Sequence, residues 1–310
     1  MDVILIHLGS RPPAFVRTAA AQVQAISGRA PLFIGPVRGA RLRGRRLDRF
    51  RAVERLTDMG LNGFWRYSAE RLFVLEEAMR RAGLARCLHI ESDNLLYVAP
   101  AEYERWLAGA YGDGIAVCPL TDHEDTAAVM YVGSLAALAE LNAGLLELVE
   151  LGPARLLELH SGGMANEMRM LRLLRTERGL ARALPTTTEA AQELGAAQVF
   201  DAASYGQLVD GTPATPGVSY AGDHHEVGRL VLDGRVRVRW DAQQHRPFTA
   251  RAADGLEMPL ANLHIHSKRL ERWTTETVPP GRPRPSPAQR AAFAGRAAFT
   301  AVRRARRRSS

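Results

Sequence analysis

The chain has 310 residues, of which 46% are hydrophobic and 24% charged. This composition is typical of a globular protein with a core and excludes low-complexity and collagen-like chains. No apolar run approaches the roughly 20 residues that a membrane-spanning helix needs. The net charge of +8 is misleading, because residues 281–310 hold nine arginines and no acid. The first 280 residues are close to neutral, which argues against nucleic acid as a partner.

In the first 135 residues, apolar runs alternate with helical patterns. Strands are predicted at 2–9, 31–35, 87–92, 114–120 and 127–133. Helices are predicted at about 13–28, 64–81 and 101–111, and a loop with some helix at 38–58. The first run has no basic segment before it, so it predicts a strand rather than a signal peptide. This alternation indicates an α/β fold with a mostly parallel sheet and helices on both faces.

The second half of the chain is less regular. Helices are predicted at 134–151 and 166–177, a β-hairpin at 228–240 around Asp233-Gly234, and a last strand at 262–268. Beyond Val278 the sequence is first proline-rich and then rich in alanine and arginine. Such a tail is expected to be disordered or weakly helical.

Cysteine and lysine are both rare. Cys87 and Cys118 lie in apolar, strand-like runs, which favours reduced, packed thiols in a cytoplasm over a disulfide framework. Among the 41 lysines and arginines, Lys268 is the only lysine. The arginine bias is typical of a GC-rich genome, so a retained lysine suggests a need for its compact ammonium group, with chance as the alternative.

An acidic cluster follows the strand predicted at 87–92. Glu91 and Asp93 are separated by one residue at the carboxyl end of this strand, where ligands of parallel sheets bind. Two such carboxylates repel each other unless a cation or a hydrogen-bond network lies between them. Their oxygens suit Mg²⁺ or Mn²⁺. The alternative is an ordinary polar loop.

Two further segments carry polar residues at suggestive spacings. His264 and His266 lie two apart on the last predicted strand and so share one face, with Lys268 next on that face. They form a cationic, metal-ligating strip or, alternatively, the solvent-exposed face of a strand. Asp201 and Gln207 lie in FDAASYGQLVDG (200–211), which could equally be a helix with Asp201 as N-cap and Gly211 as its end.

Together, HIESDNLLY (89–97), FDAASYGQ (200–207) and LHIHSK (263–268) resemble a group of glycosyltransferases of the GT-A fold. The resemblance spans roughly residues 1–275. It implies a GT-A (Rossmann-like) mixed, mainly parallel sheet flanked by helices, with a small β-hairpin region near the C-terminal end. It also implies a catalytic domain over 1–275, with a donor half over about 1–135 and an acceptor half over about 136–275, followed by the tail at 276–310.

The resemblance also implies roles for individual residues. Asp93 corresponds to the carboxylate that binds a divalent metal, Mn²⁺ or Mg²⁺, and Glu91 to the one near ribose or metal. His264 or His266 corresponds to the metal-ligating histidine of glycogenin-like enzymes, and Lys268 to the lysine that meets the diphosphate. Because the spacing differs from those enzymes, both histidines remain candidates.

The remaining contacts are predicted from position. Gly9 and Ser10 would let the first loop approach the nucleotide, and Arg66 and Arg71 lie in the early turns of a helix, where phosphate is favoured. We expect Asp201 and Gln207 to bind the acceptor or the sugar. Candidate catalytic bases are the loop acids Asp122, Glu124 and Asp125, and Glu167 at a helix start.

The sequence thus predicts a metal-dependent glycosyltransferase that uses a nucleotide-diphosphate sugar and a glycan or other hydroxyl acceptor. A nucleotidyltransferase or metal phosphohydrolase with the same site is one alternative, and a non-enzymatic, basic-tailed interaction protein is another. The chain lacks a phosphate-binding GxxxxGK[ST] loop and a GxGxxG after its first strand. We expect a cytoplasmic protein, with peripheral contact of the tail to an anionic membrane as an alternative to disorder.

Overall fold

The computed structural model describes residues 1–9, 11–56, 63–159, 166–211, 225–241 and 243–276. Its helices are α1 (Ala14–Ser27), α2 (Pro36–Arg41), α3 (Arg45–Val53), α4 (Phe64–Ala82), α5 (Pro100–Tyr111), α6 (Leu135–Glu150), α7 (Gly152–Leu159), α8 (Glu167–Thr176), α9 (Thr188–Glu193), α10 (Ser204–Asp210) and α11 (Glu226–Leu232). Its strands are β1 (Asp2–Ile6), β2 (Leu32–Ile34), β3 (Cys87–Glu91), β4 (Asn94–Leu96), β5 (Ile115–Pro119), β6 (Asp125–Val132), β7 (Arg182–Ala183), β8 (Val236–Asp241), β9 (Arg246–Arg251), β10 (Glu257–Pro259) and β11 (Asn262–His264). Ser10 and, apart from Glu276, the predicted tail lie outside the described residues.

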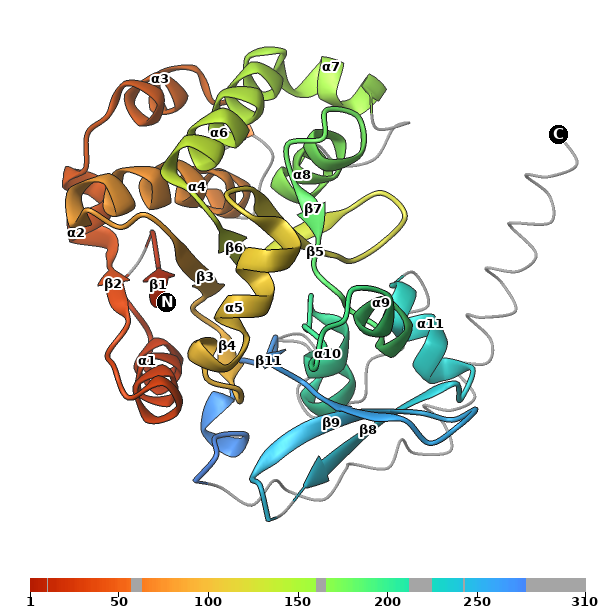
Figure 1. Cartoon of the computed structure of the whole chain (residues 1–310). Coiled ribbons are helices and arrows are strands. Elements are labelled where there is room, and N and C mark those ends of the chain that lie inside the picture. Colours follow the sequence, from red (N-terminus) through yellow and green to blue (C-terminus); the bar gives the residue numbers. More distant parts are fainter. Residues whose placement is uncertain (10, 57–62, 160–165, 212–224, 242, 277–310) are drawn as a thin grey trace, which may run out of the picture.

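A six-stranded sheet in the order β2-β1-β3-β6-β5-β7 forms the centre of the molecule (Figure 1). β1 is parallel to β2 and β3, and β5 is parallel to β7, whereas β6 is antiparallel to both of its neighbours. This mixed, mainly parallel sheet confirms the predicted α/β class. Because β1, β2 and β3 run the same way, their carboxyl ends meet at one edge, which is where such sheets bind ligands.

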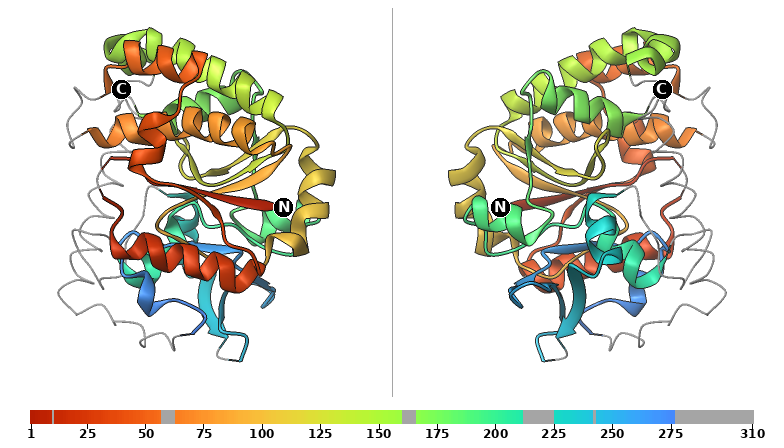
Figure 2. Two further views of the ribbon diagram at one scale, coloured as in Figure 1. Left: turned by 90° about the vertical axis from the view of Figure 1, so that its left-hand side faces the viewer. Right: turned by 90° about the vertical axis from the view of Figure 1, so that its right-hand side faces the viewer.

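Helices cover both faces of the sheet, as predicted. In the left view of Figure 2 the sheet lies between α4 (orange) above and α1 (red) below. Ile4 and Ile6 of β1 point into a core built with α3, α4, α6 and α8, while Val3 and Leu5 point into a second core with α1 and α5. This alternation in a continuously apolar strand is typical of a strand buried on both sides.

A short two-stranded sheet joins the end of the described chain to its middle. β11 pairs antiparallel with β4, so that His264 lies opposite Asn94. The amide N–H of Ile265 donates to the carbonyl oxygen of Asp93 at 2.9 Å, and Nδ2 of Asn262 donates to Oδ1 of Asn94 at 2.6 Å. Both asparagines are fully buried. These bonds fix the histidine segment against the acidic strand end.

The β-hairpin predicted around Asp233-Gly234 is wrong in its first arm. The residues before this pair form helix α11, which ends where the amide N–H of Arg235 donates to the carbonyl oxygen of Leu230 at 2.9 Å. Gly234 has a φ of 70°, and a glycine in this left-handed conformation ends a helix as well as it forms a hairpin turn. The antiparallel unit is instead β8, β9 and β10, so the predicted small β region is present.

Residues 38–58 contain more helix than the loop predicted for them. In α3, Leu47 and Phe50 are buried. Its arginines pair with acids of α4, as in the Arg51–Glu70 ion pair at 2.6 Å. The apolar pattern alone missed this helix because ion pairs to α4 supply part of its packing.

Two predictions about composition can be compared with the structure. Cys87 and Cys118 are buried and free, as predicted. Across the part of the chain that the structure describes, no helix combines the length and apolar character needed to cross a membrane.

Candidate active site

A cavity of about 680 Å³ opens at the carboxyl edge of the sheet. Its walls come from the end of β1, the early turns of α4, the β3–β4 turn, the start of α8, α10 and the segment after β11. The predicted site residues that line it are Arg71, Glu91, Asp93, Glu124, Glu167, Gln207, His264, His266 and Lys268. Tertiary structure therefore gathers most of the predicted site in one place.

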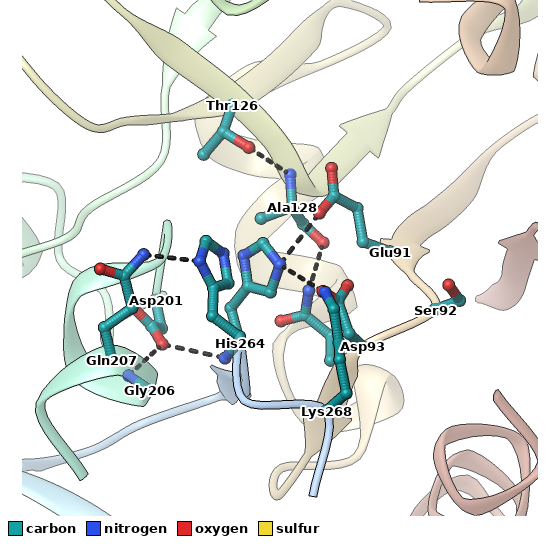
Figure 3. Close-up of polar contacts among 12 residues, drawn as sticks. Glu91, Ser92, Asp93, Thr126, Ala128, Asp201, Gly206, Gln207, His264 and Lys268 are labelled. Carbon is teal, nitrogen blue, oxygen red and sulfur yellow. Dashed lines mark hydrogen bonds and ion pairs between the residues drawn. The ribbon is translucent and has the colours of Figure 1, made fainter. Parts of the chain in front are cut away.

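The acidic strand end and the histidine segment meet in this cavity (Figure 3). Nε2 of His264 lies 3.0 Å from a carboxylate oxygen of Glu91 and 3.1 Å from one of Asp93. One ligand atom each from Asp93, His264 and His266 lie within 4.8 Å of one another. Two hard carboxylates beside an imidazole are a donor set that fits a divalent cation such as Mn²⁺. This answers why a buried strand ends in two carboxylates.

His264 is held in place from both sides. Its Nδ1 donates to the carbonyl oxygen of Ala202 at 2.9 Å, and its backbone N–H donates to Oδ2 of Asp201 at 2.9 Å. Burial lowers the pKa of His264, but the Asp93 and Glu91 carboxylates outweigh it and raise the pKa to about 10. Without a metal, a proton thus takes the position between the carboxylates. A histidine anchored through its other ring nitrogen is typical of metal ligands.

Asp201 supports the site from behind and does not line the cavity. Its carboxylate also accepts from the backbone N–H groups of Tyr205, at 3.0 Å, and Gly206, at 2.8 Å. Asp201 is fully buried, and burial raises its pKa despite these bonds. The predicted N-cap is displaced, since Ala203 occupies the N-cap position of α10, but Asp201 still satisfies the first amides of that helix.

Gln207 and His266 form a second pair beside the first. Nε2 of Gln207 lies 2.6 Å from Nδ1 of His266. The rings of His264 and His266 are 4.1 Å apart, edge to face. Burial, followed by the charge on His264, lowers the pKa of His266 to about 3, so this imidazole is neutral at physiological pH.

Lys268 completes the cluster, although the predicted last strand ends earlier, at His264. The chain turns after Ile265, and Lys268 adopts a left-handed φ of 64°, which is costly for a residue with a side chain. Its ammonium donates to the Asp93 carboxylate. Asp210 holds the turn by accepting from the hydroxyl of Ser267 and from Nη2 of Arg269, the latter at 2.8 Å.

Arg71 links the acidic strand end to the start of α8. One of its terminal nitrogens lies 2.6 Å from Glu91 and 3.2 Å from Glu167. Burial raises the pKa of Glu91, but Arg71 and His264 outweigh it, so the net shift is downward. Glu167 is further from Arg71, and its burial raises its pKa to about 7. One cation shared unequally thus separates the pKa values of two carboxyl groups.

The predicted catalytic acids fall into two pairs. Glu124 and Glu167 line the cavity. Asp125 is fully buried in β6 and forms a bidentate ion pair with Arg175, at 2.6 and 3.1 Å. Asp122 is 69% exposed and lies on a different, smaller cavity. The geometry therefore favours Glu124 and Glu167 over Asp122 and Asp125.

Gly9 and Arg66 line a neighbouring cavity of about 480 Å³ rather than the first. Leu8 and Tyr67 line both cavities and separate them. Gly9 has a φ of 91°, and a side chain there would meet the Tyr67 ring at 3.1 Å. Nε of Arg66 lies 3.4–3.5 Å from Glu54 and Glu70, so existing ion pairs already occupy this predicted phosphate contact.

Sequence reasoning missed the aromatic wall of the cavity. Phe15, Phe64, Trp65 and Tyr67 line it, and the Lys268 ammonium lies 5.6 Å from the centre of the Phe15 ring. The start of α4 supplies three of these residues, and their apolar spacing alone predicts only core packing.

Comparisons with known proteins add the following. No protein-family model and no curated protein matches the sequence. Similar solved structures include mouse xyloside xylosyltransferase 1 (12% identity, TM-score 0.41, 62% of this chain and 89% of that one). They also include galactosyltransferase LgtC in complex with donor and acceptor sugar analogues (14%, 0.38, 60% and 74%), and a glycosyltransferase involved in glycosylation of the major capsid of PBCV-1 (14%, 0.37, 62% and 88%). At TM-scores below 0.5, such similarity does not assign a function to this chain.

Proposed function

We propose that this chain is a metal-dependent glycosyltransferase that moves a sugar from a nucleotide-diphosphate donor to an acceptor hydroxyl. The observation that carries the proposal is the meeting of Asp93, His264, His266 and Lys268 in one cavity at the carboxyl edge of the sheet. A carboxylate–imidazole set beside a lysine suits a cation and the oxygens of a diphosphate together.

Asp93 and the two histidines are the proposed holders of a divalent cation, with Glu91 beside them. The cation would neutralise negative charge on the departing diphosphate. Lys268 contributes a compact positive charge to the same oxygens, which accounts for a single lysine in an arginine-rich chain. We assign the nucleoside end of the donor to the neighbouring cavity at Gly9 and Arg66.

Glu167 is the proposed acid–base residue, with Glu124 as its alternative. A pKa of about 7 suits a group that must both take up and release a proton near neutral pH. Arg71 orients Glu167 through the 3.2 Å contact. A hydroxyl of the acceptor would have to lie within hydrogen-bond distance of Glu167.

The decisive experiment is calorimetric titration of UDP, GDP and dTDP into the protein, with and without Mn²⁺. We expect one nucleotide to bind only when Mn²⁺ is present, and Asp93→Ala to abolish that binding without loss of the folded state. Asp233→Ala, on the surface at the end of α11, is the matched control. Metal-dependent binding that survives in Asp93→Ala would refute the proposed site.

The same metal site could serve a nucleotidyltransferase or a phosphohydrolase. These reactions release pyrophosphate or phosphate from nucleoside triphosphates or phosphoesters, whereas the proposed reaction releases a nucleoside diphosphate from a nucleotide sugar. Analysis of the products from each substrate class separates them. Release of pyrophosphate or phosphate without turnover of any nucleotide sugar would replace the proposed function by this alternative.

A further inference from the structure

The two neighbouring histidines have different hydrogen-bond partners at their Nδ1 atoms. Nδ1 of His264 faces a carbonyl oxygen, that of Ala202, at 2.9 Å. Nδ1 of His266 faces an amide nitrogen, that of Gln207, at 2.6 Å. A carbonyl oxygen only accepts a hydrogen bond, and a side-chain NH₂ group only donates one. The two rings are therefore held in opposite tautomers.

In His264 the proton lies on Nδ1, because only a protonated nitrogen can donate to the Ala202 carbonyl oxygen. When this ring is neutral, its Nε2 carries a lone pair. That lone pair points between the carboxylates of Glu91 and Asp93, at 3.0 and 3.1 Å. A lone pair and two anions directed at one point require a cation there.

In His266 the lone pair lies on Nδ1, because Nδ1 accepts from the Gln207 amide. The proton of the neutral ring is then on Nε2, and a protonated nitrogen cannot bind a metal. His266 lines the same cavity as Lys268. Its Nε2–H can therefore donate to an anionic oxygen that the cation and Lys268 also contact.

We propose that His264 is the imidazole ligand of the metal, that His266 is a hydrogen-bond donor to the diphosphate, and that Gln207 positions this donor by fixing its tautomer. The inference rests on the proposed function for the diphosphate, and on the metal site alone for the division between the histidines.

The support of α10 keeps Gln207 in register with His266. The carboxylate of Asp201 binds the first amides of α10 and the backbone N–H of His264. The neighbouring Gly206 packs directly on the backbone of His264. The helix and the histidine segment thus form one unit, so the Gln207 amide cannot shift to another partner without breaking these contacts.

The first test reads the tautomers directly. In protein labelled with ¹⁵N-histidine, with no metal and at a pH where the His266 ring is neutral, long-range ¹H–¹⁵N spectra distinguish a proton on Nδ1 from one on Nε2. We expect His266 to carry its proton on Nε2 in the wild type and to lose this preference in Gln207→Met. A wild-type His266 with its proton on Nδ1 would overturn the proposal, whether or not any variant folds.

The second test separates the two binding roles by titrating Mn²⁺ alone, and then inorganic pyrophosphate at saturating Mn²⁺. We expect His264→Leu to weaken Mn²⁺ binding at least tenfold. His266→Leu should change Mn²⁺ binding less than about threefold but weaken pyrophosphate binding about tenfold, the usual scale for a hydrogen bond to a charged group. His266→Gln, which retains an N–H donor, should restore part of that loss.

Gln22→Met is the control, since Gln22 is also buried but bonds the carbonyl oxygen of Leu96 outside the cavity. It should lower thermal stability and leave both affinities unchanged. Equal losses of Mn²⁺ affinity in His264→Leu and His266→Leu, or unchanged pyrophosphate affinity in His266→Leu, would each refute the division of roles. If the protein binds Mn²⁺ through His264 but turns over no nucleotide sugar, the proposed function fails while the metal assignment stands.

Discussion

Replacement of Gly206 by alanine tests whether the FDAASYGQ motif holds the metal-binding segment. A Cβ atom on Gly206 would lie 2.5 Å from the carbonyl carbon and 3.1 Å from the nitrogen of His264, and closer still to its carbonyl oxygen. These neighbours are backbone atoms, so no side-chain rotation can relieve the overlap. Either α10 or β11 has to move.

The cost can be estimated from the packing. Adding a methyl group to a well-packed site usually destabilises a protein by about 1–3 kcal/mol, and a backbone neighbour favours the upper half of that range. Because the displaced residue is His264, we also expect Mn²⁺ to bind at least tenfold more weakly, as in losses of supporting contacts around metal ligands.

Urea unfolding and Mn²⁺ titration of Gly206→Ala measure the two effects. Gly109→Ala is the matched control, since Gly109 lies within α5 and a Cβ there meets nothing within 4 Å. That change should stabilise the protein by about 0.5–1 kcal/mol, the usual gain for glycine to alanine within a helix. Wild-type stability and Mn²⁺ affinity in Gly206→Ala would disprove the supporting role of the motif.

Three further predictions concern titratable groups. Glu167→Gln should lower turnover by a factor of about 10²–10⁴ with little change in nucleotide affinity, and wild-type turnover should rise with pH through about 7 as the carboxyl group ionises; an unchanged turnover number would exclude Glu167 as the base. Burial, and then the charge of Arg71, lowers the pKa of the fully buried His89 to about 3, so its contribution to stability is complete above about 6.5 and falls by up to about 1.4 kcal/mol per pH unit as the pH drops toward 3. Urea midpoints from pH 7 to pH 5 should show a shallower decline in His89→Asn, and parallel curves would contradict this. Asp125→Asn should cost about 3 kcal/mol by leaving Arg175 without its buried partner, yet leave Mn²⁺ affinity intact, and a large loss of that affinity would show that Asp125 belongs to the metal site.

Much of the donor half follows from local patterns. The strand at 2–6 and the helix from Phe64 to Ala82 with its Gly83 stop were predicted closely, because apolar periodicity and glycine act over a few residues. The acidic triplet could be placed at a strand end for the same reason. The hairpin at Asp233-Gly234 failed because this pair is compatible with both a turn and a helix end.

The candidate site divides along the same line. The sequence by itself determined which residues carry the chemistry: two carboxylates after a buried strand, two histidines two residues apart and a single lysine. Only the tertiary structure decided which groups meet, since β4–β11 pairing joins Asp93 to His264 across about 170 residues. It also decided their charge states, because burial and the sharing of Arg71 separate Glu91 from Glu167. Side-chain type is a local property, whereas proximity, desolvation and tautomer depend on partners that the chain brings from far away.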